Sequence, residues 1–244
     1  MGSIHGLEKH NAERTAVYRK VTMEKDIVQN YDELYALQDR VLGIVFSEET
    51  PFYLTGGTAL HRFYCNARYS DDLDFFMNGQ PYFYDEVKEI IYRLRKYFEI
   101  ETVINTKDFL RIKIGQLKID FVNDRVYKYG ISNKIRDFAV DNVFNILANK
   151  LTAVIGRDEE KDVFDIVSVC LMYEFDWKMI LKAAHQKEYF DDCTLIERLK
   201  TFPLWWLENL KLIKPMPITE TLISTLCQDI SHKDKNSVFG IKYE

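Results

Sequence analysis

The sequence holds only four cysteines, and none of them lies in a C-x-x-C pair or at another spacing typical of a metal site. Three of the four fall in apolar stretches that read as helices, so we interpret them as buried, reduced thiols, as expected in a reducing cytoplasm. No apolar run approaches the ~20 residues that a membrane-spanning helix needs. The polar N-terminus also has no signal-peptide core. We therefore expect a soluble, cytoplasmic protein that does not use a membrane.

A strong positive charge is also absent. The formal net charge of −5 argues against a protein that coats nucleic acid without specificity. The chain nevertheless has a local basic excess, because residues 107–136 contain eight basic and three acidic side chains. Within this stretch, Tyr127-Lys128-Tyr129 is a candidate for acceptor binding or a solvated surface cluster. Trp205-Trp206 could stack on bases, but we expect the pair to pack in a helix core.

Familiar catalytic motifs are missing as well. The sequence has no H-E-x-x-H, no P-loop and no G-x-S-x-G elbow, and its five histidines show no metal-ligand spacing. Internal repeats and Gly/Ser linkers are also lacking. These absences leave the carboxylates and glycines as the residues most able to carry chemistry.

Hydrophobic periodicity divides the chain into two parts. The first part predicts a helix over 24–46 preceded by a polar helical arm, and another helix around 87–98. It also predicts a helix beginning at Thr58 and strands at 52–55, 72–76, 101–105, 109–114 and 116–122. The second part predicts helices only, at 142–155, 160–173, 177–187, 193–201, 204–213 and 217–230. We therefore predict an α/β (α+β) fold with a small mixed sheet in residues 1–140 and a helical domain, 141–244, packed on it.

Gly56 and Gly57 stand between a predicted strand and a predicted helix. Two residues without Cβ allow a tight turn whose backbone N–H groups can approach a ligand closely. The following helix start and the Thr58 hydroxyl would add donors for a phosphate group. A Gly-Gly turn before a helix is common, however, and in isolation it is as easily explained by structure alone.

Three aspartates provide the second element of the candidate site. Asp72 and Asp74 are two residues apart on a strand, so both carboxylates should point to one side while Leu73 enters the core. Asp120 lies in a later strand between Ile119 and Phe121, where a carboxylate needs a cation as partner. Carboxylate oxygens suit Mg²⁺, and three of them could hold two metal ions for phosphoryl chemistry. We expect the three aspartates on neighbouring strands of one sheet, with both glycines at the same end and the carboxylates within metal-bridging reach.

The runs LTGGTALHRFY and RYSDDLDFF resemble the nucleotidyltransferase superfamily and, more narrowly, the AbiEii/AbiGii toxin family of toxin–antitoxin pairs. In that pattern a glycine turn precedes a D-x-D pair and a third acidic residue on a later strand. The positions that match it are Gly56, Gly57, Asp72, Asp74 and Asp120. The chain departs from the pattern between these motifs. Fourteen residues separate Gly57 from Asp72, about one more than the family leads us to expect, and only Arg68 matches the basic motif of the intervening loop.

The resemblance implies further site residues in the second part. It marks a lysine in NILANKLTAVIGR and a charged helix in RDEEKDVFDIV, which gives Lys150, Arg157, Lys161, Asp162 and Asp165. Lys150 and Lys161 suit triphosphate oxygens as compact positive charges. The alternative for both lysines is a solvated helix face. Asp165 could orient Lys150 or Arg157, or simply form a helix salt bridge.

The family also implies an activity. It predicts transfer of a nucleoside monophosphate from an NTP, with Mg²⁺ or Mn²⁺ as cofactor and Asp72, Asp74, Asp120 and Lys150 as catalytic residues. The implied acceptor is RNA, such as the tRNA 3′ end, and the implied partner is a cognate antitoxin. Two alternatives remain open: a nucleotidyltransferase that modifies a small molecule or a protein, and a non-catalytic nucleotide-binding module.

Overall fold

The computed structural model describes residues 30–216 and 218–241. The polar arm expected before residue 24 lies outside this part. Internal contacts divide the chain into two units, residues 1–36 and 37–244. Of the first unit only residues 30–36 are described, and they contain the start of helix α2 (Tyr31–Val45). The description below concerns the second unit.

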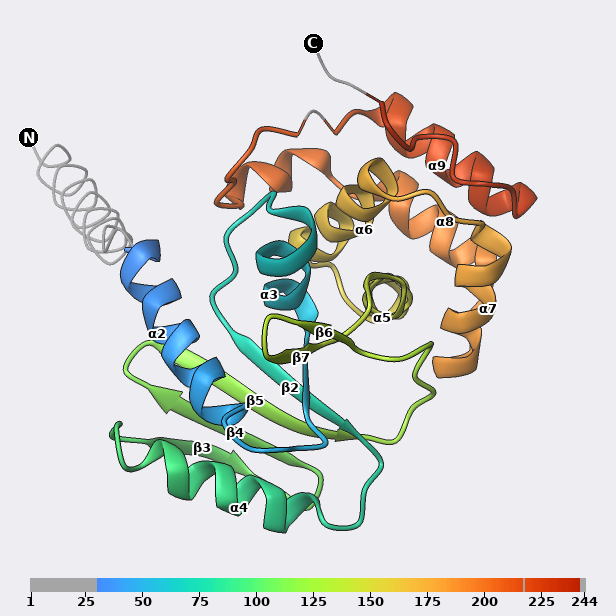
Figure 1. The fold of residues 1–244 in the computed structure, drawn as a ribbon. Helices are drawn as coiled ribbons and strands as arrows, with labels where there is room; N and C mark the ends of the chain where they lie inside the picture. The colour runs from blue at the N-terminus through green and yellow to red at the C-terminus, as the bar shows by residue number, and fades with distance from the viewer. Residues whose placement is uncertain (1–29, 217, 242–244) are drawn as a thin grey trace, which may run out of the picture. The chain divides into compact units, whose positions relative to one another are not determined.

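A seven-stranded mixed sheet forms the first half of this unit, as Figure 1 shows. The strand order is β3-β4-β5-β2-β1-β7-β6, with parallel pairs β2–β5 and β1–β7 and antiparallel pairs elsewhere. The strands are β1 (Tyr53–Thr55), β2 (Leu73–Asn78), β3 (Glu101–Asn105), β4 (Phe109–Ile114), β5 (Leu117–Asp124), β6 (Asn133–Ile135) and β7 (Phe138–Val140).

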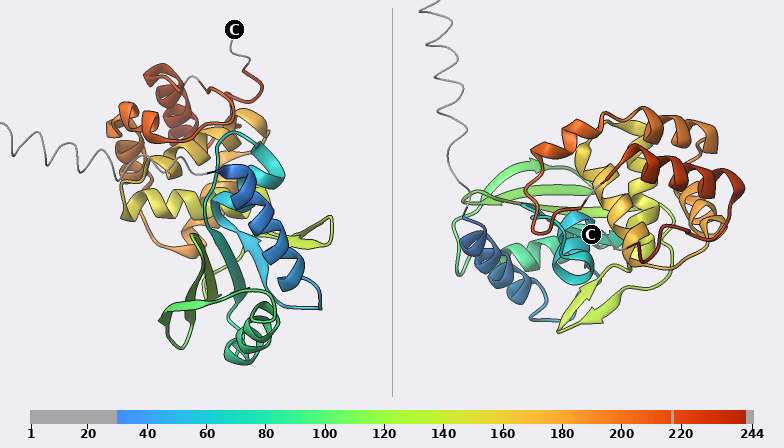
Figure 2. Two further views of the ribbon diagram at one scale, coloured as in Figure 1. Left: turned by 90° about the vertical axis from the view of Figure 1, so that its left-hand side faces the viewer. Right: turned by 90° about the horizontal axis from the view of Figure 1, so that it is seen from above.

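The helices of this unit lie between the strands and after them. They are α3 (Gly56–Leu60), the π-helix η1 (His61–Cys65), α4 (Phe83–Leu94), α5 (Val143–Gly156), α6 (Glu160–Met172), α7 (Trp177–Lys187), α8 (Asp192–Thr201), the 3₁₀-helix η2 (Leu204–Asn209) and α9 (Glu220–His232). From α5 onward the chain forms only helices, which gather on one side of the unit in both views of Figure 2. The predicted fold class, a mixed sheet with flanking helices and a helical C-terminal half, is confirmed. The division into domains near residue 140 stays a prediction.

Alternating side chains give the central strands one apolar face. Phe75 of β2 and Phe121 of β5 are fully buried, and their rings stack with centroids 5.2 Å apart. Phe52, just before β1, packs on Phe121 at 5.3 Å and on Phe83 of α4 at 5.9 Å. This aromatic core fixes the position of β2 and β5. Asp74, which stands between Leu73 and Phe75, and Asp120, which precedes Phe121, must therefore face the opposite side of the sheet.

Local structure differs from the sequence analysis at two places. The sequence analysis assigned no element to the hairpin β6–β7, whose strand β7 extends the sheet by pairing Val140 with Leu54. Residues 204–213 were expected as an α-helix, but only the 3₁₀-helix η2 forms there. Beyond η2 the chain is not helical, and Ile213 N–H bonds the Ala67 carbonyl at 2.9 Å. Trp205 is 67% exposed on η2, so the expected core packing of this residue does not occur.

Candidate active site

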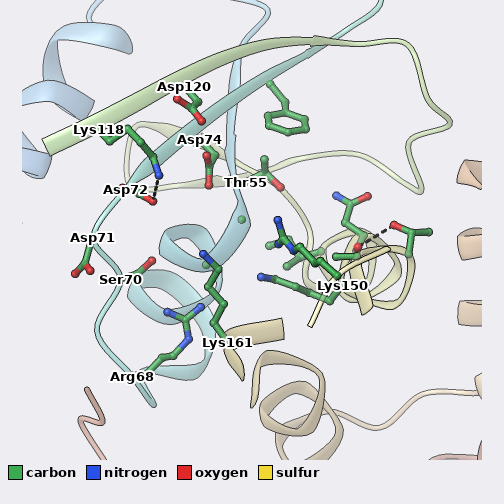
Figure 3. A pocket seen from close by; sticks show the side chains of 18 of the residues that line it. Thr55, Arg68, Ser70, Asp71, Asp72, Asp74, Lys118, Asp120, Lys150 and Lys161 are labelled. Atoms are coloured by element: carbon green, nitrogen blue, oxygen red, sulfur yellow. Dashed lines mark hydrogen bonds and ion pairs between the residues drawn. The ribbon is translucent and has the colours of Figure 1, made fainter. Parts of the chain in front are cut away.

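One cavity of about 450 Å³ lies where β2 and β5 face helices α5 and α6. Figure 3 shows it from close by. The structure brings nine of the twelve site residues predicted from the sequence to its wall: Gly56, Gly57, Arg68, Asp72, Asp74, Asp120, Lys150, Arg157 and Lys161. The other three, Thr58, Asp162 and Asp165, are buried behind the wall.

The aspartates meet through strand register. Asp74 of β2 and Asp120 of β5 are partners across the parallel pair, and Thr55 at the end of β1 is the other partner of Asp74. Asp72 comes immediately before β2 and lines the same cavity. Burial, together with the negative charges of Asp120 and Asp72, raises the pKa of Asp74 to about 6. The aspartates therefore repel one another, as expected of carboxylates gathered for a cation.

The glycine turn lies against these carboxylates. Gly56 has φ +72°, which is costly for any residue with a Cβ. A Cβ at Gly56 would also overlap the Asp74 carboxylate, and one at Gly57 would lie 2.7 Å from Arg68 Nη2. Both glycines are thus required by close approach. They stand at the same end of the sheet as the aspartates, as predicted.

Thr58 has a different position from the one expected. Its hydroxyl bonds Ser70 Oγ at 2.9 Å and the Asp72 carbonyl oxygen, and the residue is 1% exposed. Thr58 therefore ties the turn to the segment that carries Asp72, and does not line the cavity. Helix α3 is only five residues long and passes into the π-helix η1, where Asn66 N–H bonds the His61 carbonyl at 3.0 Å.

The cationic side of the cavity rests on two buried aspartates of α6. Asp165 accepts two hydrogen bonds from the Arg68 guanidinium, at 2.7 and 2.8 Å, and forms an ion pair with Lys150 at 2.7 Å. Asp162 pairs with Lys150 at 2.7 Å and with Arg157 at 2.7 Å. Burial alone would lower the pKa of Lys150, but the charges of Asp165 and Asp162 more than offset it and raise the pKa. Lys150 is thus held charged at the cavity wall.

This network answers several alternatives left open by the sequence. Lys150 is only 8% exposed, which excludes a solvated helix face. Asp165 orients Lys150 as one alternative proposed, whereas Asp162 holds Arg157. Lys161 is more exposed and lies 3.7 Å from Glu159, so its solvated-face alternative stays open.

Two contributors were missed by the sequence analysis. His61 Nε2 lies 2.7 Å from Asp165, and burial lowers the pKa of this histidine. The segment around Arg68 is braced by the last third of the chain, because Arg68 forms a bridge with Leu212. No sequence motif marks either contact.

Comparison with known proteins gives the family. A family model described as "Nucleotidyl transferase AbiEii toxin, Type IV TA system" matches residues 42–230, about three quarters of the chain. The chain belongs to this family. The resemblance found in the sequence is thereby confirmed. No curated protein matches the sequence.

Solved structures similar to this AbiEii-family chain share little sequence with it. JHP933 from Helicobacter pylori is 20% identical, with a TM-score of 0.49 over 72% of this chain and 75% of that one. A putative nucleotidyltransferase from H. pylori is 20% identical, with a TM-score of 0.46 over 72% and 77%. MenT4, a nucleotidyltransferase toxin from Mycobacterium tuberculosis H37Rv, is 15% identical, with a TM-score of 0.40 over 79% and 71%.

Two further cavity residues of this AbiEii-family chain pair with the aspartates. Arg111 of β4 donates to both carboxylate oxygens of Asp120 at 2.7 Å, and Lys118 of β5 lies 2.5 Å from Asp72. The sequence analysis missed both. A hairpin centred on Gly115 places Arg111 opposite Asp120, so register counting from this turn would have found the first pair.

The aspartates fit a hard divalent cation by the chemistry of their oxygens. The side chains of Asp120 and Asp72, however, are paired with Arg111 and Lys118. Within residues 30–216 and 218–241, no group of three His, Cys, Asp or Glu side chains stands ready to hold a metal ion. The expectation that the three carboxylates converge within metal-bridging reach is therefore not met, because Asp72 pairs with Lys118 and Asp120 with Arg111.

The other predicted surfaces lie elsewhere. Tyr127 and Tyr129 line a separate hollow of about 230 Å³ with Met179 and Lys182. Lys128 lies 4.4 Å from the centroid of the Tyr53 ring. None of the three lines the main cavity, and their role in acceptor binding stays a prediction. In the described part of the chain, no helix is long and apolar enough to cross a membrane.

Proposed function

We propose that this protein transfers a nucleoside monophosphate from an NTP to an RNA acceptor, such as the tRNA 3′ end, and acts as the toxin of a toxin–antitoxin pair. The observation that carries the proposal is the pairing of Asp74 with Asp120 beside the Gly56 turn, in a cavity whose other wall is cationic. Membership of the AbiEii nucleotidyltransferase toxin family supports the same reaction and an antitoxin partner. Scattered free cysteines support a cytoplasmic site of action.

The cationic wall would receive the triphosphate. Gly56 and Gly57 leave room for phosphate oxygens close to the backbone, and Arg68, Lys150, Arg157 and Lys161 supply positive charge around them. Because Lys150 is fixed by two aspartates, it loses little side-chain entropy when it binds a phosphate. Fixed charge of this kind stabilises the transition state of phosphoryl transfer.

The anionic wall would carry the metal site. Asp72, Asp74 and Asp120 would hold Mg²⁺ or Mn²⁺, which when bound neutralises the charge that develops during phosphoryl transfer. The acceptor hydroxyl attacks the α-phosphorus, a new P–O bond forms, and the bond to the β-phosphate breaks to release pyrophosphate. Asp120 helps to remove the hydroxyl proton. Lys150 remains charged throughout and steadies the departing phosphates.

The test is incubation of the protein with each labelled NTP, Mg²⁺ and total RNA. Label on RNA, with release of pyrophosphate, is the expected result. Label on protein or on a small molecule instead would move the acceptor to one of the alternatives. Nucleotide binding without any transfer would identify a non-catalytic module. Growth of cells that express the protein, compared with cells that express the Asp120→Asn variant, tests the toxin assignment separately.

A further inference from the structure

Arg111 and Lys118 lie on the outer side of the aspartates. In the strand order β4-β5-β2-β1, Arg111 is on β4 and Lys118 on β5, whereas the Gly56 turn follows β1. The aspartates therefore separate these two cations from the wall proposed for the triphosphate. Figure 3 shows Lys118 and Lys150 on opposite sides of the aspartates.

Both cations are bound to carboxylates that the reaction needs for metal. Arg111 forms a bidentate pair with Asp120, and Lys118 forms a single contact of 2.5 Å with Asp72. Both cationic side chains are 31% exposed. The single, partly exposed contact of Lys118 with Asp72 is a weak ion pair that a divalent cation can displace, whereas the bidentate pair of Arg111 with Asp120 is the stronger of the two. Since the Asp72 side chain is 34% exposed and that of Asp120 only 9%, Asp72 should exchange more readily.

Asp74 has no such counter-ion. Among residues 30–216 and 218–241 no cation forms an ion pair with it. The cavity thus holds two carboxylates paired with cationic side chains and one, Asp74, without an ion pair among the described residues. A metal ion entering at Asp74 would then compete for Asp72 and Asp120, and each carboxylate that it takes releases one positive side chain into the cavity.

We propose that Arg111 and Lys118 bind backbone phosphates of the acceptor RNA once a divalent cation has taken Asp120 and Asp72 from them. The inference rests on the proposed function. In-line transfer places the attacking hydroxyl and the departing pyrophosphate on opposite sides of the α-phosphate. The released cations lie on the attacking side, where an anionic acceptor would be held and a cationic small molecule repelled. Until a metal ion binds, Arg111 and Lys118 remain paired with Asp120 and Asp72 and cannot bind phosphate. The acceptor site therefore forms only when the metal site is filled.

The first arm of the test measures metal binding without nucleotide. The affinity for Mn²⁺ is compared among wild type, Arg111→Gln, Lys118→Gln and the control Lys113→Gln. Lys113 lies two residues from Arg111 on β4, opposite Lys118 and outside the cavity, and no aspartate of the cavity pairs with it, so its removal lowers the positive charge of the hairpin without freeing a carboxylate. Loss of the competing cation should tighten Mn²⁺ binding, by roughly tenfold for Arg111→Gln, or ~1.4 kcal/mol. The increase should be smaller for Lys118→Gln and absent for Lys113→Gln.

The second arm measures RNA binding in the presence of a non-hydrolysable NTP. With Mg²⁺, each cavity variant should bind RNA about tenfold more weakly and lower the slope of log affinity against log salt by about one. Arg111→Lys keeps the charge and should retain most of the binding. Without a divalent cation, the cavity variants should bind RNA as wild type does. Melting temperatures close to that of wild type verify that the variants fold.

Two results would overturn the inference. Unchanged or weaker Mn²⁺ binding in Arg111→Gln would show that Arg111 does not compete with the metal ion and that its ion pair only stabilises the β4–β5 hairpin. Unchanged RNA binding in both cavity variants would remove them from the acceptor site. Neither binding assay needs turnover. If wild type labels RNA and the two assays fail, only this inference is lost. If wild type labels no RNA, the proposed function fails independently.

Discussion

Replacing Gly56 by alanine tests whether the turn and the aspartates form one unit. At φ +72° an alanine costs about 1–2 kcal/mol of backbone strain. Its Cβ would also overlap Asp74 Oδ2 and lie 3.3 Å from Cγ of the same carboxylate. Because Asp74 sits in a central strand, the side chain must rotate away, and such crowding adds about 1–3 kcal/mol. Displacing a reacting group by ~1 Å can lower turnover ~10²-fold.

Gly115 provides the matched control. It has φ +58°, but no atom lies within 4 Å of the position that its Cβ would occupy. Gly115→Ala therefore carries the backbone strain without any collision and should retain nucleotide transfer. The measurements are the melting temperature and the transfer rate of both variants. Each kcal/mol of lost stability should lower the melting temperature by ~2–4 °C. If Gly56→Ala is no less stable than Gly115→Ala and equally active, the contact with Asp74 does not matter and our account of the turn is wrong.

Three other substitutions probe the two walls of the cavity. Asp120→Asn should lower nucleotide incorporation into RNA about 10²–10⁴-fold while NTP binding survives, and full activity or toxicity of the variant would contradict the role of Asp120. Lys150→Met should weaken NTP binding, which titration with NTP measures. It should also lower the free energy of unfolding by up to ~3–5 kcal/mol, measured by calorimetry, because two buried aspartates lose a partner. The pKa of Asp74 is about 6 in the folded protein and near 3.8 in the unfolded chain. Between these two values the folded protein holds a proton that the unfolded chain has released. The free energy of unfolding, measured with a chelator present, should therefore rise as the pH falls from about 6 toward 4. Asp74→Asn should flatten this rise, and an identical pH profile would show that another group causes it.

The sequence allowed the central elements to be predicted because their signals are local. Helix α7 and strands β3 and β4 formed at the predicted residues, since α7 and β4 each have a clear apolar period and the β-branched run of β3 is bounded by a turn. The hairpin β6–β7 was missed because its strands have three residues each, too few to show alternation. Its support comes from pairing with β1, which lies some 80 residues earlier in the chain.

The same distinction applies to the cavity. The glycines and aspartates could be found because turn chemistry and a spacing of two are visible in the sequence. The pairing of Arg68 with Asp165 joins residues 97 positions apart, and only the tertiary fold brings them together. Lys118 was visible as part of a basic stretch, but its contact with Asp72 depends on how β5 lies beside β2. A basic stretch alone could not tell which of its members enter the cavity.

The π-helix η1 lies in the segment that connects Gly57 with Asp72, and the length of this segment can change there. A π-helix closes its hydrogen bond over five residues where an α-helix uses four, so one inserted residue can be accommodated as a wider turn. It stands between Gly57 and Asp72, in the interval that is about one residue longer than the family pattern leads us to expect. Both ends of the interval are fixed, by Thr58 with Ser70 and by Arg68 with Asp165. An insertion or deletion in η1 should therefore be tolerated without moving a motif residue, and relatives are better recognised by these anchors than by the spacing between them.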